Sequence, residues 1–281
     1  MEQTSLRAAL LTATTELAPS PTARRDAELL LLHALDRDLA WLLAHSDEAT
    51  LPEQASLYAD WIARRARQEP VQYIVGEQEF WGLRLRVTPD VLIPRPETEH
   101  LVEAALARLP KASNGPTRIA DIGTGSGAIA LALASERPEA EITALDLSPA
   151  ALLVAQQNAH ALGLEKQIRF LQSDLLSALH NERFKMIVSN PPYIPSGERL
   201  EAQVYDYEPH SALFAGADGL TIYERLIPAA WAALEPGGSL LLEIGYGQKD
   251  ALSTLLADWA KIEFIPDLQG IPRVAVAERR T

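Results

Sequence analysis

From residue 118 to residue 278, segments typical of β-strands alternate with segments typical of α-helices. The β-branched and apolar stretches predict strands over residues 118–122, 141–146, 168–172, 184–189, 238–244, 261–265 and 272–278. Helical periodicity predicts helices over residues 128–136, 148–162, 219–234 and 247–259. This alternation is typical of an α/β domain whose mainly parallel sheet has helices on both faces. The last two strands are too close in sequence for a crossover helix, so we expect them to pair antiparallel.

The chain before this region has a different character. Residues 1–70 read as helices with short breaks, which predicts a small helical domain for recognition or scaffolding. Residues 72–75 and 79–87 are short, rich in aromatic and β-branched side chains and broken by glycines, which predicts a β-hairpin.

An extended connector follows this hairpin. The alternating prolines Pro94 and Pro96 hold the chain extended, so that Arg95 can be placed accurately against a neighbouring domain. A helix is expected to begin near Thr98 and to run to about Leu109, and a turn is expected over residues 111–117.

Composition excludes several classes of function. The chain has no cysteine, which excludes disulfides, thiolate metal sites and cysteine nucleophiles. Its formal net charge of −13 argues against broad electrostatic binding of nucleic acid. Arg64, Arg65 and Arg67 form a small basic group, which we interpret as a solvated helix face. The sequence shows neither a long apolar segment nor the basic start of an export signal, so we expect a cytoplasmic protein without membrane contact.

The first predicted strand of the α/β region runs into the glycine-rich stretch Asp121-Ile122-Gly123-Thr124-Gly125-Ser126-Gly127. Glycines at alternate positions let the backbone pass close to a ligand. Asp146 ends the next strand, where an acidic side chain can hold ribose hydroxyls. The spacing fits nicotinamide and flavin sites as well as S-adenosylmethionine sites. Asp121 favours S-adenosylmethionine, because an acidic group at the strand end can lie near a positively charged part of the ligand.

A second motif, Asn190-Pro191-Pro192-Tyr193, follows the strand predicted over residues 184–189. Two consecutive prolines cannot continue a helix or an interior strand, so the segment presents an amide side chain, a carbonyl and an aromatic ring on a rigid turn. An ordinary turn could have the same sequence. Open α/β sheets bind ligands at the carboxyl ends of their strands, so this motif is expected near the glycine loop. A motif that can bind an NH2 group beside an adenosine site favours methyl transfer to nitrogen over hydride transfer.

These motifs, in this order, resemble those of the amino methyltransferases, and in particular those of the peptide chain release factor N(5)-glutamine methyltransferase family. Further matches are Phe80-Trp81-Gly82, Leu92-Ile93-Pro94-Arg95-Pro96-Glu97-Thr98-Glu99, and the segments 208–220 and 267–273. The resemblance implies a helical N-terminal domain for substrate recognition (1–70), a β-hairpin and extended linker (71–97) and a seven-stranded, Rossmann-like methyltransferase domain (98–281). It also implies methylation of the glutamine in the Gly-Gly-Gln motif of class I release factors, with S-adenosylhomocysteine as the second product.

The resemblance also implies roles for individual residues. The cofactor-binding set is Asp121, Gly123, Thr124, Gly125, Ser126, Gly127, Asp146, Leu175 and Asn190. Leu175 falls near the adenine, at a position where some relatives have tryptophan. The substrate-binding set is Asn190, Pro191, Pro192 and Tyr193, of which Asn190 and Tyr193 are the catalytic residues.

Our mechanistic hypothesis concerns the amide nitrogen, which is a poor nucleophile. The Asn190 side-chain oxygen and the Pro191 carbonyl would each accept a hydrogen bond from one N–H of the glutamine NH2. These bonds would direct the nitrogen lone pair at the methyl group. Tyr193 would pack its ring against the amide. No general base is required, and no metal is expected, because the histidines after the predicted hairpin show no metal-ligand spacing.

Three other functions fit the same motifs. An adenine-specific nucleic-acid methyltransferase could use the tetrapeptide to hold an exocyclic amine. A glutamine methyltransferase acting on a ribosomal protein would use the same chemistry, and a cofactor-binding module without activity is a third possibility. The acidic segment 201–208 is either a mobile lid or a solvated loop, and the sequence does not distinguish them.

Overall fold

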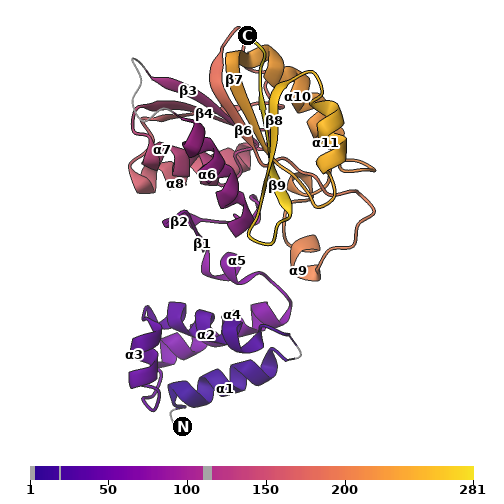
Figure 1. Cartoon of the computed structure of the whole chain (residues 1–281). Helices are drawn as coiled ribbons and strands as arrows, with labels where there is room; N and C mark the ends of the chain where they lie inside the picture. Colours follow the sequence, from indigo (N-terminus) through magenta and orange to yellow (C-terminus); the bar gives the residue numbers. More distant parts are fainter. Residues whose placement is uncertain (1–3, 19, 110–115) are drawn as a thin grey trace. The chain divides into compact units, whose positions relative to one another are not determined.

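The computed structural model describes residues 4–18, 20–109 and 116–281, which form two compact units (Figure 1). The first unit comprises Met1–Glu77 and Leu200–Tyr207, and the second comprises Gln78–Arg199 and Glu208–Thr281. Most of the turn predicted over residues 111–117 lies outside the described residues.

The first unit is helical, as predicted. Its helices are α1 (Leu6–Glu16), α2 (Ala23–Leu35), α3 (Leu39–Ala44), α4 (Pro52–Ala66), α5 (Val71–Val75) and the short α9 (Ala202–Tyr205). Side-chain caps start two of them, because Ser5 accepts a hydrogen bond from the Ala8 N–H and Asp38 accepts one from the Trp41 N–H. The core between the helices is mainly aliphatic, includes Tyr58, and buries Leu30 and Leu31 completely.

Two of the three arginines of the predicted basic group are paired inside this unit. Arg65 donates from Nε to Asp26 Oδ2 at 2.8 Å, and each of these side chains is only 10% exposed. Arg64 donates from Nε to Glu69 Oε2 at 2.9 Å. The interpretation as a solvated face is therefore wrong for these two arginines, because each charge is matched by a carboxylate as it leaves water.

The stretch 72–75, predicted as a strand, lies in helix α5 instead. Gly76 ends this helix with a φ of 81°, and its N–H donates to the Gln72 carbonyl at 2.8 Å. Pro70 precedes the helical turn and Gly76 ends it in the left-handed conformation. These two signals outweigh the strand preference of the β-branched residues between them. The hairpin consists of β1 (Glu77–Phe80) and β2 (Leu83–Arg86), joined by a two-residue turn with positive φ at both positions.

The second unit is the predicted α/β domain, built on a seven-stranded sheet of order β5-β4-β3-β6-β7-β9-β8. The strands are β3 (Thr117–Ile122), β4 (Ala140–Asp146), β5 (Ile168–Gln172), β6 (Phe184–Ser189), β7 (Leu234–Glu243), β8 (Ala260–Pro266) and β9 (Pro272–Glu278). The helices are η1 (Pro96–Thr98), α6 (Glu99–Arg108), α7 (Ala128–Glu136), α8 (Pro149–Leu162), η2 (His210–Ala212), α10 (Thr221–Ala233) and α11 (Lys249–Leu255). β9 pairs antiparallel with β7 and with β8, which confirms the predicted antiparallel end.

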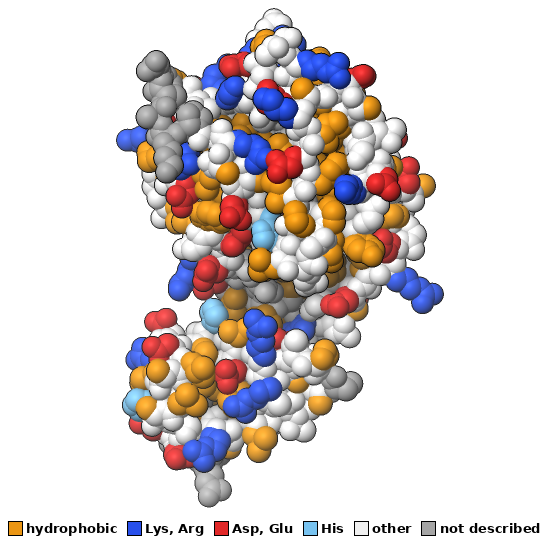
Figure 2. Space-filling view, viewed as in Figure 1, with side chains coloured by type: hydrophobic (Ala, Val, Ile, Leu, Met, Phe, Trp, Pro, Cys, Tyr) orange, Lys and Arg blue, Asp and Glu red, His pale blue; other side chains and the backbone are white. Residues whose placement is uncertain are grey.

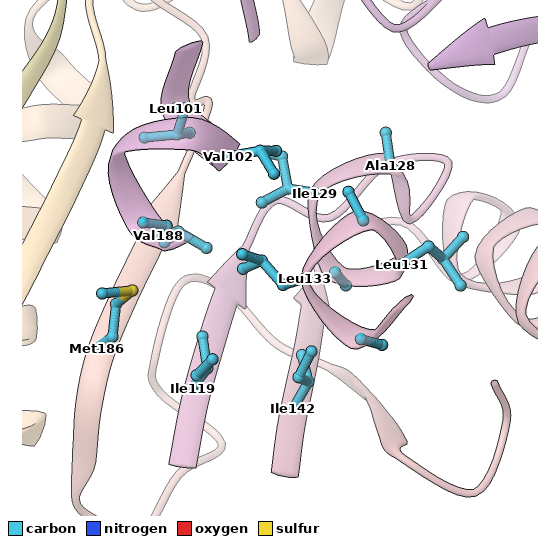
Figure 3. Close-up of a cluster of buried hydrophobic side chains, with 14 of the residues drawn as sticks. Leu101, Val102, Ile119, Ala128, Ile129, Leu131, Leu133, Ile142, Met186 and Val188 are labelled. Carbon is cyan, nitrogen blue, oxygen red and sulfur yellow. The ribbon is translucent and has the colours of Figure 1, made fainter. Parts of the chain in front are cut away.

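Apolar side chains cover both faces of this sheet. On one face, Ile119 of β3 and Ile142 of β4 pack toward Leu133 of α7, and Val188 of β6 lies under Leu101 of α6 (Figure 3). The other face packs on α10 and α11, with Tyr223 and Leu252 completely buried. Burial on both faces explains why the central strands β3 and β6 have continuous buried runs without the alternation of a half-exposed sheet.

Candidate active site

The ends of three neighbouring parallel strands lie level with one another. Ile122 at the end of β3 is in register with Leu145 of β4 on one side and with Ser189 of β6 on the other. The Ser189 Oγ donates to the Ile122 carbonyl at 2.7 Å and ties two of these ends together. The next residue of each strand or loop, Gly123, Asp146 and Asn190, therefore lies at the same edge of the sheet.

The glycine loop between β3 and α7 uses its glycines in two ways. A Cβ atom at Gly125 would meet nothing within 4 Å, so this part of the loop leaves open space. A Cβ atom at Gly127 would lie 3.1 Å from Leu131 Cδ1 and 3.2 Å from Ala155 Cβ, and the φ of this residue is 86°. Gly127 thus allows the loop to pack closely on α7 and α8.

Asp146 braces this loop from β4. Its Oδ2 accepts a hydrogen bond from the Gly125 N–H at 2.8 Å, and its Oδ1 accepts one from the Ser148 N–H at 2.8 Å. Burial raises the pKa of Asp146, and these backbone donors act in the opposite direction. Each carboxylate oxygen retains further acceptor capacity, which suits the two adjacent hydroxyls of a ribose.

Asp121 is the most deeply buried acidic group at this edge, with no exposed surface. Its Oδ2 accepts from the Thr124 hydroxyl at 2.7 Å, whereas its Oδ1 has no hydrogen-bond partner among the residues that the structure describes. Burial raises the pKa of Asp121 to about 7, and the Thr124 hydroxyl lowers it. An unpartnered carboxylate oxygen beneath the loop would be stabilised by a cationic part of a ligand.

The pKa of Asp121 leads to a prediction for stability. The folded-state pKa is about 7 and the ordinary value is 3.8, so between these values the folded protein binds more protons than the unfolded chain. The free energy of unfolding of the second unit should therefore fall as the pH rises from about 4 to 7. Asp121→Asn does not titrate and should gain up to about 4 kcal/mol relative to the original protein over this range, at 1.36 kcal/mol per pKa unit.

Hydrogen exchange of β3 and β6 amides at pH 5 and pH 8, without ligand, measures this difference. Any contribution from Glu243, which also titrates in this range, is common to both proteins and cancels. A stability difference that does not change with pH would contradict the assignment.

A cavity of about 270 Å³ joins the glycine loop to the tetrapeptide. The predicted site residues that line it are Gly123, Thr124, Gly125, Ser126, Asp146, Leu175, Asn190, Pro191 and Pro192. Asp121, Gly127 and Tyr193 are not part of the described lining. The remaining lining includes Leu92, Pro94 and Arg95 of the extended segment, together with Arg225, which pairs with Asp174 at 2.6 Å.

Asn190 reaches the cavity with its amide held in one orientation. Its Nδ2 donates to the Thr98 hydroxyl at 3.0 Å, so the side-chain Oδ1 is the atom left to accept hydrogen bonds from a ligand. Pro192 has no N–H and cannot extend the strand, which leaves the neighbouring Pro191 carbonyl outside the sheet ladder. These two oxygens can accept hydrogen bonds from the two N–H bonds of one planar NH2 group.

Tyr193 is fixed from behind this lining. Its hydroxyl donates to Glu243 Oε1 at 3.4 Å, and its carbonyl accepts from Gln248 Nε2 at 3.0 Å. A Cβ atom at Gly245 would lie 2.9 Å from Tyr193 Cδ2, so the ring packs directly on the backbone after β7. Burial raises the pKa of Tyr193 well above its ordinary value. Direct contact of this ring with a substrate amide stays a prediction.

Two acidic residues of this region have roles that the sequence analysis missed. Glu208 belongs to the segment 201–208, expected to be a lid or a solvated loop, yet it is 4% exposed, accepts from the Ile93 N–H at 3.2 Å and pairs with Arg95. Glu243 is 2% exposed at the end of β7. An acidic side chain within the apolar run Leu240–Ile244 was the available signal for Glu243.

The sheet order, the antiparallel end, the glycine loop after the first strand of the sheet and the acidic end of the second define a class, the S-adenosylmethionine-dependent methyltransferases. The chain matches the family model "Methyltransferase small domain" over residues 101–206 and the model "PrmC N-terminal domain" over residues 8–76.

Similar proteins extend this comparison over nearly the whole chain. A release factor glutamine methyltransferase of Koribacter versatilis is 47% identical over 269 residues, covering 95% of each chain. The protein of the same name from Escherichia coli is 44% identical over 267 residues, covering 94% of this chain and 95% of its own. This chain belongs to the release factor glutamine methyltransferase family.

Solved structures at low identity share the fold. The catalytic domain of human Mettl16, solved with an RNA hairpin, gives a TM-score of 0.57 at 16% identity and covers 94% of this chain and 92% of its own. A 16S rRNA methyltransferase of T. thermophilus, solved with AdoMet and guanosine, gives 0.55 at 24% identity, covering 73% of this chain and 50% of its own.

Proposed function

We propose that this protein transfers the methyl group of S-adenosylmethionine to the side-chain amide nitrogen of the glutamine in the Gly-Gly-Gln motif of class I release factors. Membership of the family supports the reaction and the substrate. The observation that carries the chemistry is the fixed amide of Asn190, whose Oδ1 is left to accept beside the glycine loop in one cavity.

The cofactor residues are proposed on the same basis. Asp146 would hold the ribose hydroxyls while it braces Gly125, and the unpartnered oxygen of Asp121 would favour the positively charged part of the cofactor. Leu175 lines the cavity and would offer apolar packing to the adenine. When bound, S-adenosylmethionine supplies an electrophilic methyl group and leaves as S-adenosylhomocysteine.

The residues of the chain would then act on the incoming amide. Asn190 Oδ1 and the Pro191 carbonyl each accept a hydrogen bond from one N–H of the glutamine NH2. These bonds orient the nitrogen lone pair and stabilise the positive charge that develops on the nitrogen. The proton lost after transfer goes to water, so no side chain acts as a general base. Neither step uses a metal ion.

We propose further that the helical region 1–70 contributes to recognition of the release factor, in a protein that works in the cytoplasm without binding nucleic acid directly. On the face shown in Figure 2, Lys and Arg side chains lie among Asp and Glu side chains, in keeping with a net charge of −13. No helix in the described part of the chain has the length and apolar character needed to cross a bilayer.

A labelling experiment tests the function. The protein is incubated with methyl-labelled S-adenosylmethionine and, separately, with a class I release factor, the same factor with its Gly-Gly-Gln glutamine changed to alanine, ribosomal protein and DNA. Label is expected in the unmodified release factor and to be lost with the glutamine. Label that appears only in nucleic acid or only in ribosomal protein would overturn the proposal.

A further inference from the structure

A hydroxyl group lies between Asn190 and a buried carboxylate. Thr98, at the start of α6, is 4% exposed and accepts the hydrogen bond from Asn190 Nδ2 at 3.0 Å. Its hydroxyl also lies near the buried Glu243 and lowers the pKa of that carboxyl group. Three residues from separate segments of the second unit, Asn190, Thr98 and Glu243, thus lie next to one another.

Only one of the two carboxylate oxygens of Glu243 has a hydrogen-bond partner within the described residues. Its Oε1 accepts from the Tyr193 hydroxyl at 3.4 Å, and its Oε2 has no hydrogen-bond partner within the described residues. Burial raises the pKa of Glu243 to about 7; Thr98, Arg273 and Tyr193 lower it and Glu97 raises it further. A carboxyl group in this position costs stability, since an apolar residue would suit the end of an apolar strand better.

We propose that the Thr98 hydroxyl donates its proton to the unpartnered Glu243 Oε2, and that Thr98 and Glu243 are thereby positioning residues that fix the amide orientation of Asn190 for methyl transfer. A threonine hydroxyl has one proton to donate and two lone pairs that accept. With its proton directed to Glu243, Thr98 can only accept from its other neighbour, so Asn190 must present Nδ2 to Thr98. Asn190 Oδ1 is thereby kept toward the cavity.

The alternative orientation would be unproductive. An asparagine amide is nearly symmetrical in shape, so packing alone discriminates weakly between the two orientations. A turned amide would present its own NH2 to the NH2 of the substrate, and two donors cannot form the hydrogen bond that orients the nitrogen. Glu243 also holds Tyr193, so the same carboxylate secures both ends of the tetrapeptide.

The inference rests on the proposed function for its kinetic part. Thr98→Val removes the hydroxyl at nearly constant size, and Thr98→Ser restores it. We expect Thr98→Val to lower kcat for release-factor methylation about 10- to 100-fold, the range found when a partner that orients a site residue is removed. The affinity for S-adenosylmethionine and the KM for the release factor should stay within about threefold, and Thr98→Ser should return kcat to within about threefold of the original value.

Glu243→Gln tests the second residue, because its NH2 can donate to Thr98 and so releases the Thr98 proton toward Asn190. The fold-loss in kcat of the double variant Thr98→Val, Glu243→Gln should be smaller than the product of the fold-losses of the two single variants, since both substitutions act through Asn190. Thr254→Val, on the exposed side of α11, is the matched control and should retain full activity.

An NMR measurement separates failure of this inference from failure of the proposed function. The side-chain NH2 signals of Asn190, assigned with Asn190→Asp, should show slowed solvent exchange in the original protein and in Thr98→Ser but not in Thr98→Val. Equal protection in Thr98→Val, or kcat as low in Thr98→Ser as in Thr98→Val, would overturn the inference. Absence of release-factor labelling by the original protein, with the NMR pattern intact, would overturn only the proposed substrate.

Discussion

Replacing Asn190 with alanine is expected to lower the rate of methyl transfer at least 10²- to 10³-fold, or about 3–4 kcal/mol in activation free energy, while the affinity for S-adenosylmethionine stays within about tenfold. The variant loses Oδ1, one of the two acceptors proposed for the glutamine NH2. The amide nitrogen would then enter the site without a fixed direction for its lone pair. The braces of the glycine loop come from Asp146 and remain in place.

Single-turnover methylation of a release factor, together with calorimetric titration of S-adenosylmethionine, measures the two effects separately. Gln157→Ala is the matched control, because it removes an exposed amide from α8 far along the chain from the tetrapeptide. Turnover near the original value in Asn190→Ala would refute the role proposed for this side chain.

Asp146→Ala should have the opposite pattern, with cofactor binding weakened about 10²- to 10³-fold and the rate at saturating cofactor within about tenfold. The variant loses a carboxylate that would accept from ribose hydroxyls, and hydrogen bonds to charged groups contribute about 1.5–3 kcal/mol each. It also leaves the Gly125 and Ser148 N–H groups without their acceptor, which loosens the loop.

Calorimetry with S-adenosylmethionine and with S-adenosylhomocysteine reports this loss directly. Asp250→Ala removes an exposed carboxylate of α11 and should bind both ligands normally, which controls for the change in net charge. If Asp146→Ala bound the cofactor as tightly as the control, the proposed ribose contact would be wrong.

Local periodicity was sufficient to predict the α/β domain. Most strand limits differ by at most one residue from those predicted, because the strands are rich in apolar residues and have breakers near their ends. The larger differences lie in β7, which begins at Leu234 before a glycine pair, and in α11, which ends at Leu255. At β7, pairing of Leu234 with Phe184 of β6 decides the limit, and residue preferences alone do not give it.

The candidate site was predictable only where motifs follow strand ends. Gly123, Asp146 and Asn190 meet because β3, β4 and β6 are neighbours in register, and such positions follow from the general rule for open sheets. The direction of the Tyr193 ring depends on packing against Gly245, a residue far along the chain. Pairs such as Glu208 with Ile93, 115 residues apart, arise from the fold and leave no local pattern.

The cavity has a consequence for how proteins of this kind diversify. Every residue of its described lining belongs to the second unit, so the first unit contributes none of them. Mutations in the first unit can therefore accumulate, or a different segment can replace it, without removing any group from the reaction chamber. With the proposed role of the helical region in recognition, partner choice and chemistry become separable traits, and exchange of that region is expected to redirect the methyl group to glutamines in other proteins.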